Sequence, residues 1–214
     1  MIAVVDYHKG NLKSVERGLA GVGGDARITD AAQAIARADA IVLPGVGAFA
    51  DAMASMVELG QADVLADRIA AGVPFLGICL GLHLLYEEGE EGAEPGGTVK
   101  GLGVLPGLVR ALPKVDTAGA SYKIPHVGWN SIEYCAPCDL FEGIPDGEYF
   151  YFTHSYAAPR SQADVATTTH SIEFASAVQV GPNVFGMQFH PEKSSDAGAH
   201  VLANFVRLCD GYAS

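Results

Sequence analysis

Short apolar runs alternate with segments of helical periodicity through the first 87 residues, and this alternation restricts the possible folds more than any other feature. Each apolar run predicts a strand, and each stretch with apolar residues three or four positions apart predicts a helix. Strands that alternate with helices form a parallel sheet with helices on both faces. The expected strands are residues 2–5, 26–29, 40–43 and 74–79, and the expected helices are 12–22, 31–38, 53–71 and 80–87.

Breaking and capping residues set the boundaries of these elements. Two glycines at 23–24 end the first helix, and Pro44-Gly45 ends the third strand. Asp30 can cap the second helix, and Gly60 interrupts the third. The sequence therefore predicts compact strand–helix units joined by short turns.

The pattern changes after residue 87, where loops rich in glycine and proline separate the apolar runs. The acidic run 87–91 is expected to be a solvated loop. Later strands are expected to be antiparallel or mixed, followed by a buried strand and a closing helix, at residues 108–112, 149–153, 174–180, 184–189 and 199–209. The chain shows no repeat and no linker, so a single domain over residues 1–214 is predicted. Its fold class is α/β: a mostly parallel central sheet flanked by helices, with an added antiparallel portion.

Charge and hydropathy exclude several classes of function. Acidic residues outnumber basic ones 25 to 13, and the net charge of −12 argues against nucleic acid or anionic membranes as partners. The chain contains no run of about 18 apolar residues that could span a membrane. Its first residues reach a charge at Asp6, which is not typical of a signal peptide. A cytoplasmic location is therefore expected, where the four cysteines would stay reduced.

Cys79 lies where a buried strand is expected to turn into a helix, within Gly77-Ile-Cys79-Leu-Gly81. This is the spacing of a nucleophile elbow, with sulfur in place of a serine oxygen. Flanking glycines let the strand and the helix pass closely, and the start of the helix favours the thiolate. The N–H of Leu80 is then free to receive an oxyanion. The alternative is a buried structural cysteine in a tight turn.

A base for this thiol is predicted in Phe189-His190-Pro191-Glu192, which follows another buried strand. Pro191 favours an extended conformation for His190, so the imidazole and the Glu192 carboxylate would project to one side. If the strand before His190 ends beside the strand before Cys79, the three residues form a Cys–His–Glu triad. Taken alone, His-Pro-Glu could equally be a surface turn.

A second cysteine pattern, Cys135-Ala-Pro-Cys138, could suggest a redox or zinc site. A thioredoxin-type motif opens a helix, whereas here a loop-like stretch follows. No second pair of cysteines or histidines completes a zinc site. We therefore predict neither a metal site nor a cofactor.

Several segments resemble a known family. Residues 77–81 are similar to the nucleophile motif of the class I (triad) glutamine amidotransferases, and His190-Pro-Glu192 is similar to their base motif. Along residues 2–209 the chain resembles the glutaminase subunits of imidazole glycerol phosphate synthases, most specifically in the loop Pro44-Gly-Val-Gly47. The similar segments are 6–15, 43–49, 125–130, 151–156 and 188–194.

The resemblance implies an enzyme of histidine biosynthesis that hydrolyses glutamine to glutamate and ammonia. The ammonia would pass to a (βα)8-barrel cyclase subunit, the partner in a heterodimer with hydrolase and lyase activities. That partner would make imidazole glycerol phosphate and an aminoimidazole carboxamide ribotide. The glutaminase would stay nearly inactive until the partner binds its own ligand.

The resemblance also assigns roles to residues outside the expected triad. Gly45, Val46 and Gly47 would complete the oxyanion hole with Leu80, because glycines let a peptide turn its N–H inward. His83 stands where the family carries a substrate-binding glutamine, and an imidazole cannot replace both functions of an amide. The expected glutamine-binding residues are His83, His154, Ser155 and Tyr156, and the expected partner interface is Asn11, His126, Trp129, Asn130, Tyr151 and Lys193.

Some of these assignments also have a purely structural alternative. Trp129 could anchor the core, Lys193 could simply be solvated, and the segment around Tyr151 could be a core strand with alternating aromatics. At the level of function, the alternative is a stand-alone γ-glutamyl amide hydrolase of the same fold, which would have no reason for a partner-facing loop at 125–130. A non-catalytic binding module is a third possibility, and it would require a broken triad.

Overall fold

The computed structural model describes residues 1–212, and its centre is an eight-stranded sheet in the order β2-β1-β3-β4-β14-β13-β12-β9. The strands from β2 to β14 pair in parallel, whereas β13, β12 and β9 continue the sheet in antiparallel pairs. The predicted α/β fold with a mostly parallel sheet and an added antiparallel portion is therefore confirmed. The strands are β1 (Ile2–Val5), β2 (Ala26–Thr29), β3 (Ala40–Gly45), β4 (Phe75–Cys79), β9 (Glu133–Tyr134), β12 (Asp164–Thr169), β13 (Glu173–Val180) and β14 (Val184–Met187).

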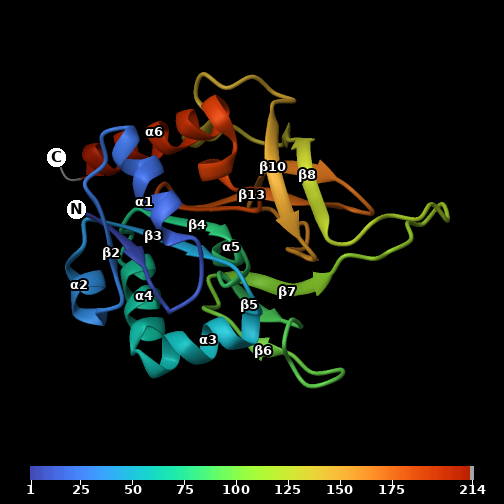
Figure 1. Cartoon of the computed structure of the whole chain (residues 1–214), viewed down its shortest axis with the longest axis horizontal. Helices are drawn as coiled ribbons and strands as arrows, with labels where there is room; N and C mark the ends of the chain where they lie inside the picture. The colour runs from blue at the N-terminus through green and yellow to red at the C-terminus, as the bar shows by residue number, and fades with distance from the viewer. Residues whose placement is uncertain (213–214) are drawn as a thin grey trace.

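Helices cover both faces of this sheet (Figure 1). Successive strand residues face opposite sides, so Val4 and Val42 pack into one buried cluster while Val5 and Leu43 pack into another. The first cluster includes α1 (Leu12–Gly21) and α6 (Ser195–Tyr212), and the second includes α2 (Ala32–Arg37), α3 (Phe49–Glu58) and α4 (Gln61–Ala70). Burial on both faces explains why the parallel strands are continuous apolar runs.

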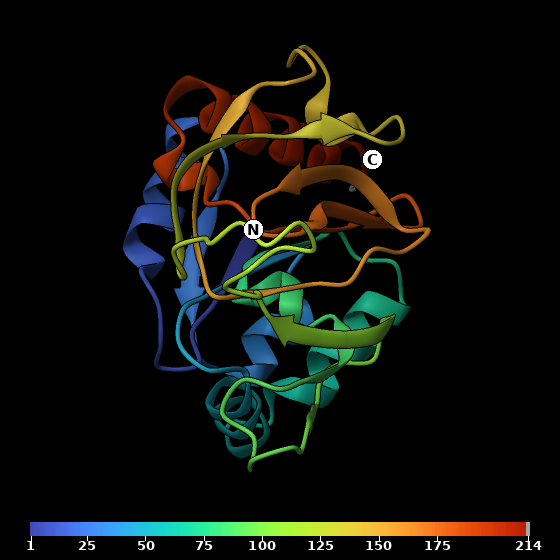
Figure 2. The same cartoon turned by 90° about the vertical axis from the view of Figure 1, so that its right-hand side faces the viewer.

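Two smaller sheets gather at the end of the molecule where the parallel strands finish (Figures 1 and 2). One is a two-stranded antiparallel ribbon of β8 (His126–Ser131) and β10 (Tyr149–His154). The other is a four-stranded sheet in the order β11-β7-β5-β6. Its strands are β5 (Tyr86–Gly89), β6 (Val99–Lys100), β7 (Leu105–Ala111) and β11 (Tyr156–Ala157).

The structure corrects three local expectations. The predicted helix 80–87 is only α5 (Leu80–His83), and the acidic run that follows is strand β5 rather than a solvated loop. Pairing with both β6 and β7 stabilises β5, and Tyr86 and Gly89 are buried. Asp30 does not cap α2: the N-cap residue is Ala31, and no side-chain cap hydrogen bond is formed there.

Two further boundaries differ from the expected ones. β3 continues through Pro44 to Gly45, and α3 begins at Phe49, four residues before the expected start. Short 3₁₀ helices occupy Asp139–Phe141 and Pro191–Lys193. Within residues 1–212, no helix has the length and apolar character needed to cross a membrane.

Candidate active site

Three adjacent parallel strands bring distant segments of the chain together at their carboxyl ends. The parallel register pairs Gly45 with Cys79 across β3 and β4, and it pairs Met187 with Ile78 across β14 and β4. Gln188 therefore follows directly beside Cys79. Ligand sites of open α/β sheets lie at this edge, where loops leave the carboxyl ends of the strands.

Cys79 occupies a backbone conformation that few residues adopt, with φ 55° and ψ −105°. Such strain persists only where the surrounding structure imposes it. A Cβ at Gly77 would lie 2.5 Å from the Gly81 carbonyl oxygen, and a Cβ at Gly81 would lie 1.8 Å from the Leu43 carbonyl oxygen. Only glycine fits at these two positions, so the elbow geometry depends on both. Because α5 is only one turn long, it offers the backbone N–H of Leu80 rather than the dipole of a long helix.

His190 and Glu192 form a buried pair next to the elbow. His190 Nδ1 lies 2.8 Å from Glu192 Oε1, and both side chains are almost fully buried. His190 is extended, as expected before proline, but Glu192 lies in the 3₁₀ turn Pro191–Lys193 rather than in an extended chain. The turn, not strand alternation, therefore brings the carboxylate to the imidazole. The His190 N–H donates to the Tyr151 carbonyl at 2.9 Å, which ties this segment to β10.

The other imidazole nitrogen of His190, Nε2, is left available beside Cys79. Nε2 is buried and has no hydrogen-bond partner in the part of the chain that the structure describes. Burial lowers the pKa of His190, but the adjacent Cys79 and Glu192 outweigh it and raise the pKa to about 9. Cys79 thus lies close enough to interact with His190, although the pair does not meet hydrogen-bond geometry in this resting structure. The surroundings of His190 therefore favour its protonated, imidazolium form.

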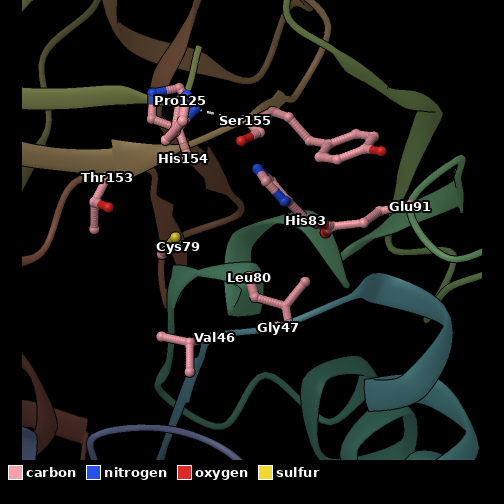
Figure 3. Close-up of a pocket in the computed structure, with 11 residues that line it drawn as sticks. Val46, Gly47, Cys79, Leu80, His83, Glu91, Pro125, Thr153, His154 and Ser155 are labelled. Carbon is pink, nitrogen blue, oxygen red and sulfur yellow. Dashed lines mark hydrogen bonds between the residues drawn. The ribbon is translucent and has the colours of Figure 1, made fainter.

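A pocket of about 270 Å³ opens above Cys79 (Figure 3). The structure brings the four predicted glutamine-binding residues together on its walls. Of the predicted oxyanion-hole residues, Gly45 lies instead on a separate small cavity that it shares with His190 and Glu192. The lining residues are Val46, Gly47, Cys79, Leu80, His83, Glu91, Pro125, Thr153, His154, Ser155 and Tyr156.

Sequence reasoning missed Glu91, which lies on the pocket wall away from Cys79 in Figure 3. Burial raises the pKa of this carboxyl. Its place in the acidic run 87–91 predicts a solvated side chain, whereas it lies in the turn that follows β5, on the pocket wall. Its neighbour in the pocket, Tyr156, was expected there from the resemblance.

The predicted partner-interface residues divide between the two faces of the β8–β10 ribbon. Trp129 is 51% exposed on the outer face, where its ring meets the Tyr151 ring edge-on. Lys193 Nζ lies 6.0 Å from the centre of the Tyr151 ring. His126 is instead buried on the inner face, with Nδ1 2.9 Å from His154 Nε2, and Asn130 donates to the Thr169 carbonyl.

We call the exposed side of this ribbon the aromatic face: Val127, Trp129, Tyr149 and Tyr151. Three of the four are at least half exposed, which is unusual for large apolar side chains grouped on one surface. Exposed Asn11 lies beside Lys193 along the small cavity that holds Glu192. The face therefore adjoins the back of the His190–Glu192 pair.

The remaining cysteines are free thiols. Cys135 is exposed, and Cys138 is partly buried, which raises its pKa to about 11. A 3₁₀ turn follows the pair rather than a longer helix. Within the described 212 residues, no three His, Cys, Asp or Glu side chains are grouped so that they could hold a metal ion.

Comparison with known proteins gives consistent matches over almost the full chain. The family glutamine amidotransferase class-I matches residues 3–209. The imidazole glycerol phosphate synthase subunit HisH of Moorella thermoacetica is 48% identical over 209 residues, covering 97% of this chain and 94% of that protein. The protein of the same name from Methanothermobacter thermautotrophicus is 44% identical, covering 97% and 98% of the two chains.

Solved structures share the fold at lower identity. A glutamine amidotransferase crystal structure superposes with a TM-score of 0.72 at 20% identity, covering 98% of this chain and all of that one. The glutaminase domain of Trypanosoma brucei CTPS with bound acivicin gives a TM-score of 0.66 at 17% identity, covering 98% and 93%. The family match and the high identities lead to one conclusion: this chain is a class I glutamine amidotransferase and belongs to the family of the imidazole glycerol phosphate synthase subunit HisH.

Proposed function

We propose that the chain hydrolyses glutamine to glutamate and ammonia with Cys79, His190 and Glu192 as its catalytic triad. One observation carries the proposal: the strained Cys79 elbow ends beside the buried His190–Glu192 pair, in which Nε2 of His190 has no hydrogen-bond partner among residues 1–212. A thiol nucleophile needs a base, and the base needs a group that orients it. All three stand at one edge of one sheet.

The first half of the reaction forms a thioester. The Cys79 thiolate attacks the carboxamide carbon of glutamine, and the carbonyl π electrons move onto oxygen. N–H groups of Leu80 and of the 45–47 loop stabilise this oxyanion. Protonated His190 donates its Nε2 proton to the departing nitrogen, so the C–N bond breaks and ammonia leaves.

The second half regenerates the enzyme. Neutral His190 removes a proton from water, which attacks the thioester carbon. The C–S bond breaks, glutamate forms and Cys79 leaves as the thiolate. Glu192 holds the imidazole through Nδ1 and stabilises its charged form in both halves.

The pocket fits the rest of the glutamine molecule. A carboxylate at Glu91, away from the sulfur, can pair with the α-ammonium group of the substrate. The segment His154-Ser155-Tyr156 forms another wall, where backbone groups can contact the substrate. A volume of about 270 Å³ suits a small amino acid rather than a large ligand.

The partner in this proposal is a (βα)8-barrel cyclase subunit in a heterodimer in the cytoplasm, as in the histidine-biosynthesis enzyme. The aromatic face supports a stable protein partner, because aromatic side chains are enriched in the centres of interfaces. It adjoins the His190–Glu192 segment through Tyr151 and Lys193. A partner bound to the aromatic face can therefore affect the His190–Glu192 pair and receive the ammonia.

The test is glutamate release from glutamine, measured for the chain alone and with the cyclase subunit and its ligand. Strong activation that disappears in Cys79→Ala is expected. Full activity without a partner would contradict the subunit proposal and favour a stand-alone γ-glutamyl amide hydrolase. Unchanged activity in Cys79→Ala would contradict the proposed nucleophile.

A further inference from the structure

Three buried polar side chains form a row that leads from the pocket to the sulfur of Cys79. His83 Nε2 lies 2.7 Å from Gln188 Oε1, and Gln188 Nε2 lies 3.7 Å from Cys79 Sγ. All three residues are at least nine-tenths buried. The Gln188 backbone N–H donates to the Ser176 carbonyl at 2.9 Å, so the strand holds this residue in place.

The direction of each hydrogen bond follows from the orientation of the Gln188 amide, whose Nε2 donates to Cys79 Sγ. A thiolate accepts hydrogen bonds, so the amide nitrogen of Gln188 must face Cys79 and the amide oxygen must face away. The reverse orientation would place a carbonyl oxygen against the negative sulfur. The oxygen then needs a donor, and the hydrogen bond that it makes within residues 1–212 is with Nε2 of His83. Hence His83 carries its proton on Nε2.

The environment of His83 agrees with a neutral imidazole in this tautomer. Burial lowers the pKa of His83 to about 4, against the smaller opposite effect of Gln188. The hydrogen bond that the His83 ring makes within residues 1–212 is at Nε2, toward Gln188, and not at the other ring nitrogen, Nδ1. A neutral ring with its proton on Nε2 therefore satisfies Gln188 and leaves no buried charge.

We propose that His83 is a positioning residue that orients the Gln188 amide so that its N–H stabilises the Cys79 thiolate. The inference rests on the proposed nucleophilic role of Cys79. In this role, His83 acts on Cys79 through Gln188 rather than by contacting the substrate. A side chain at this position need only donate one hydrogen bond, so an amide could substitute for it and an aliphatic side chain could not.

Other titratable groups also act on this row. His190 faces Cys79 from the loop after β14, and the buried Tyr7 hydroxyl faces it from the turn after β1. The thiolate raises the pKa of Tyr7 further, beyond the larger effect of burial. His154 faces His83 across the pocket. All three remain unchanged in the variants below, so their contributions cancel in the comparison.

The test is the pH dependence of alkylation of Cys79 by iodoacetamide in the full-length chain, with the Cys79 peptide quantified by mass spectrometry. His83→Leu is expected to raise the apparent pKa of the thiol and to slow alkylation about tenfold at pH values below it. Gln188→Leu should give the same shift, and the double variant should add little. His83→Gln should restore most of the wild-type profile.

Val73→Ala serves as a matched control, because Val73 is buried in the segment before β4 and takes no part in the hydrogen bonds that join His83, Gln188 and Cys79. It should lower the thermal unfolding midpoint without moving the alkylation profile. A wild-type profile in His83→Leu, with only the KM for glutamine raised, would overturn the inference and assign His83 to substrate contact. Alkylation does not require turnover. Failure of this inference can therefore be distinguished from failure of the proposed nucleophilic role, which would appear as glutaminase activity that persists in Cys79→Ala.

Discussion

The carboxyl ends of β3, β4 and β14 and the outer face of the β8–β10 ribbon place their side chains in opposite ways. The strand ends bury polar groups: His190 is paired with Glu192, and Gln188 is paired with His83. The ribbon exposes aromatic groups, with Trp129 and Tyr149 more than half accessible. Buried polar groups are costly unless partnered, and clustered exposed aromatics are uncommon on a monomer.

The difference separates two tasks. At the strand ends, backbone register and close packing fix atoms within tenths of an ångström, as reaction geometry requires. On the ribbon, a flat accessible surface suits association, which depends on area and complementarity. The two regions touch where His190 donates to the Tyr151 carbonyl, so a change on the surface has a short path to the base.

Removing the nucleophile should have the largest effect. Cys79→Ala is expected to reduce glutamate release at least about 10³-fold, because no other thiol or hydroxyl replaces the attacking atom. Partner binding should be unchanged, since Cys79 is buried and is not part of the aromatic face. Loss of binding together with activity would mean that the two regions are not separate.

Substituting one glycine should show how tightly the elbow is packed. Gly81→Ala is expected to lower the free energy of unfolding by about 3 kcal/mol, because its Cβ would lie 1.8 Å from the Leu43 carbonyl oxygen. Gly21→Ala is the matched control, since a Cβ there meets no atom within 4 Å at the end of α1. That control should change stability by at most about 1 kcal/mol, upward. Denaturant unfolding measures both, and equal effects would contradict the packing argument.

The raised pKa of His190 makes stability depend on pH. The ordinary value is 6.5 and the value in the fold is about 9, so the stabilisation is complete below pH 6.5 and is lost as pH rises through 9. The free energy of unfolding should fall by about 3 kcal/mol from below pH 6.5 to above pH 9. His190→Gln should lack this decrease. Parallel curves for the two proteins would show that the imidazolium does not stabilise the fold.

The aromatic face should give the smallest effect, and only with the partner present. Trp129→Ala is expected to weaken binding of the cyclase subunit about tenfold. The stability of the free chain should change by less than about 0.5 kcal/mol, because Trp129 is half exposed. Val57→Ala, at an exposed position of α3, is the control and should leave the binding titration with the cyclase subunit unchanged. A large loss of stability in Trp129→Ala would identify it as a core anchor instead.

Local patterns were sufficient for most of the central sheet. The strands before Cys79 and His190 are apolar runs, and apolar runs depend little on distant context. Strand β5 could not be predicted from Glu87 and Glu88, because its stability comes from pairing with β6 and β7, which lie farther along the chain. In β5, pairing with other strands outweighs the intrinsic secondary-structure propensity of the residues.

The same distinction applies to the site. Residue type and spacing indicated Cys79, His190 and Glu192, whose roles remain a proposal that the geometry supports. Gln188 was hidden inside an apolar strand, and its contact with Cys79 depends on the register between β14 and β4. Register is a non-local property, so no spacing within one segment could reveal that contact.

The position of β14 has a consequence for synthesis of the chain. This strand is inserted between β4 and β13 in the middle of the sheet, although it is the last strand to be made. Cys79 leaves the ribosome about 110 residues before His190, which corresponds to roughly 5–20 s of translation. During that interval the nascent chain carries the thiol without its base, its amide neighbour or the strand that aligns them. The enzyme therefore remains inactive until the polypeptide is nearly complete.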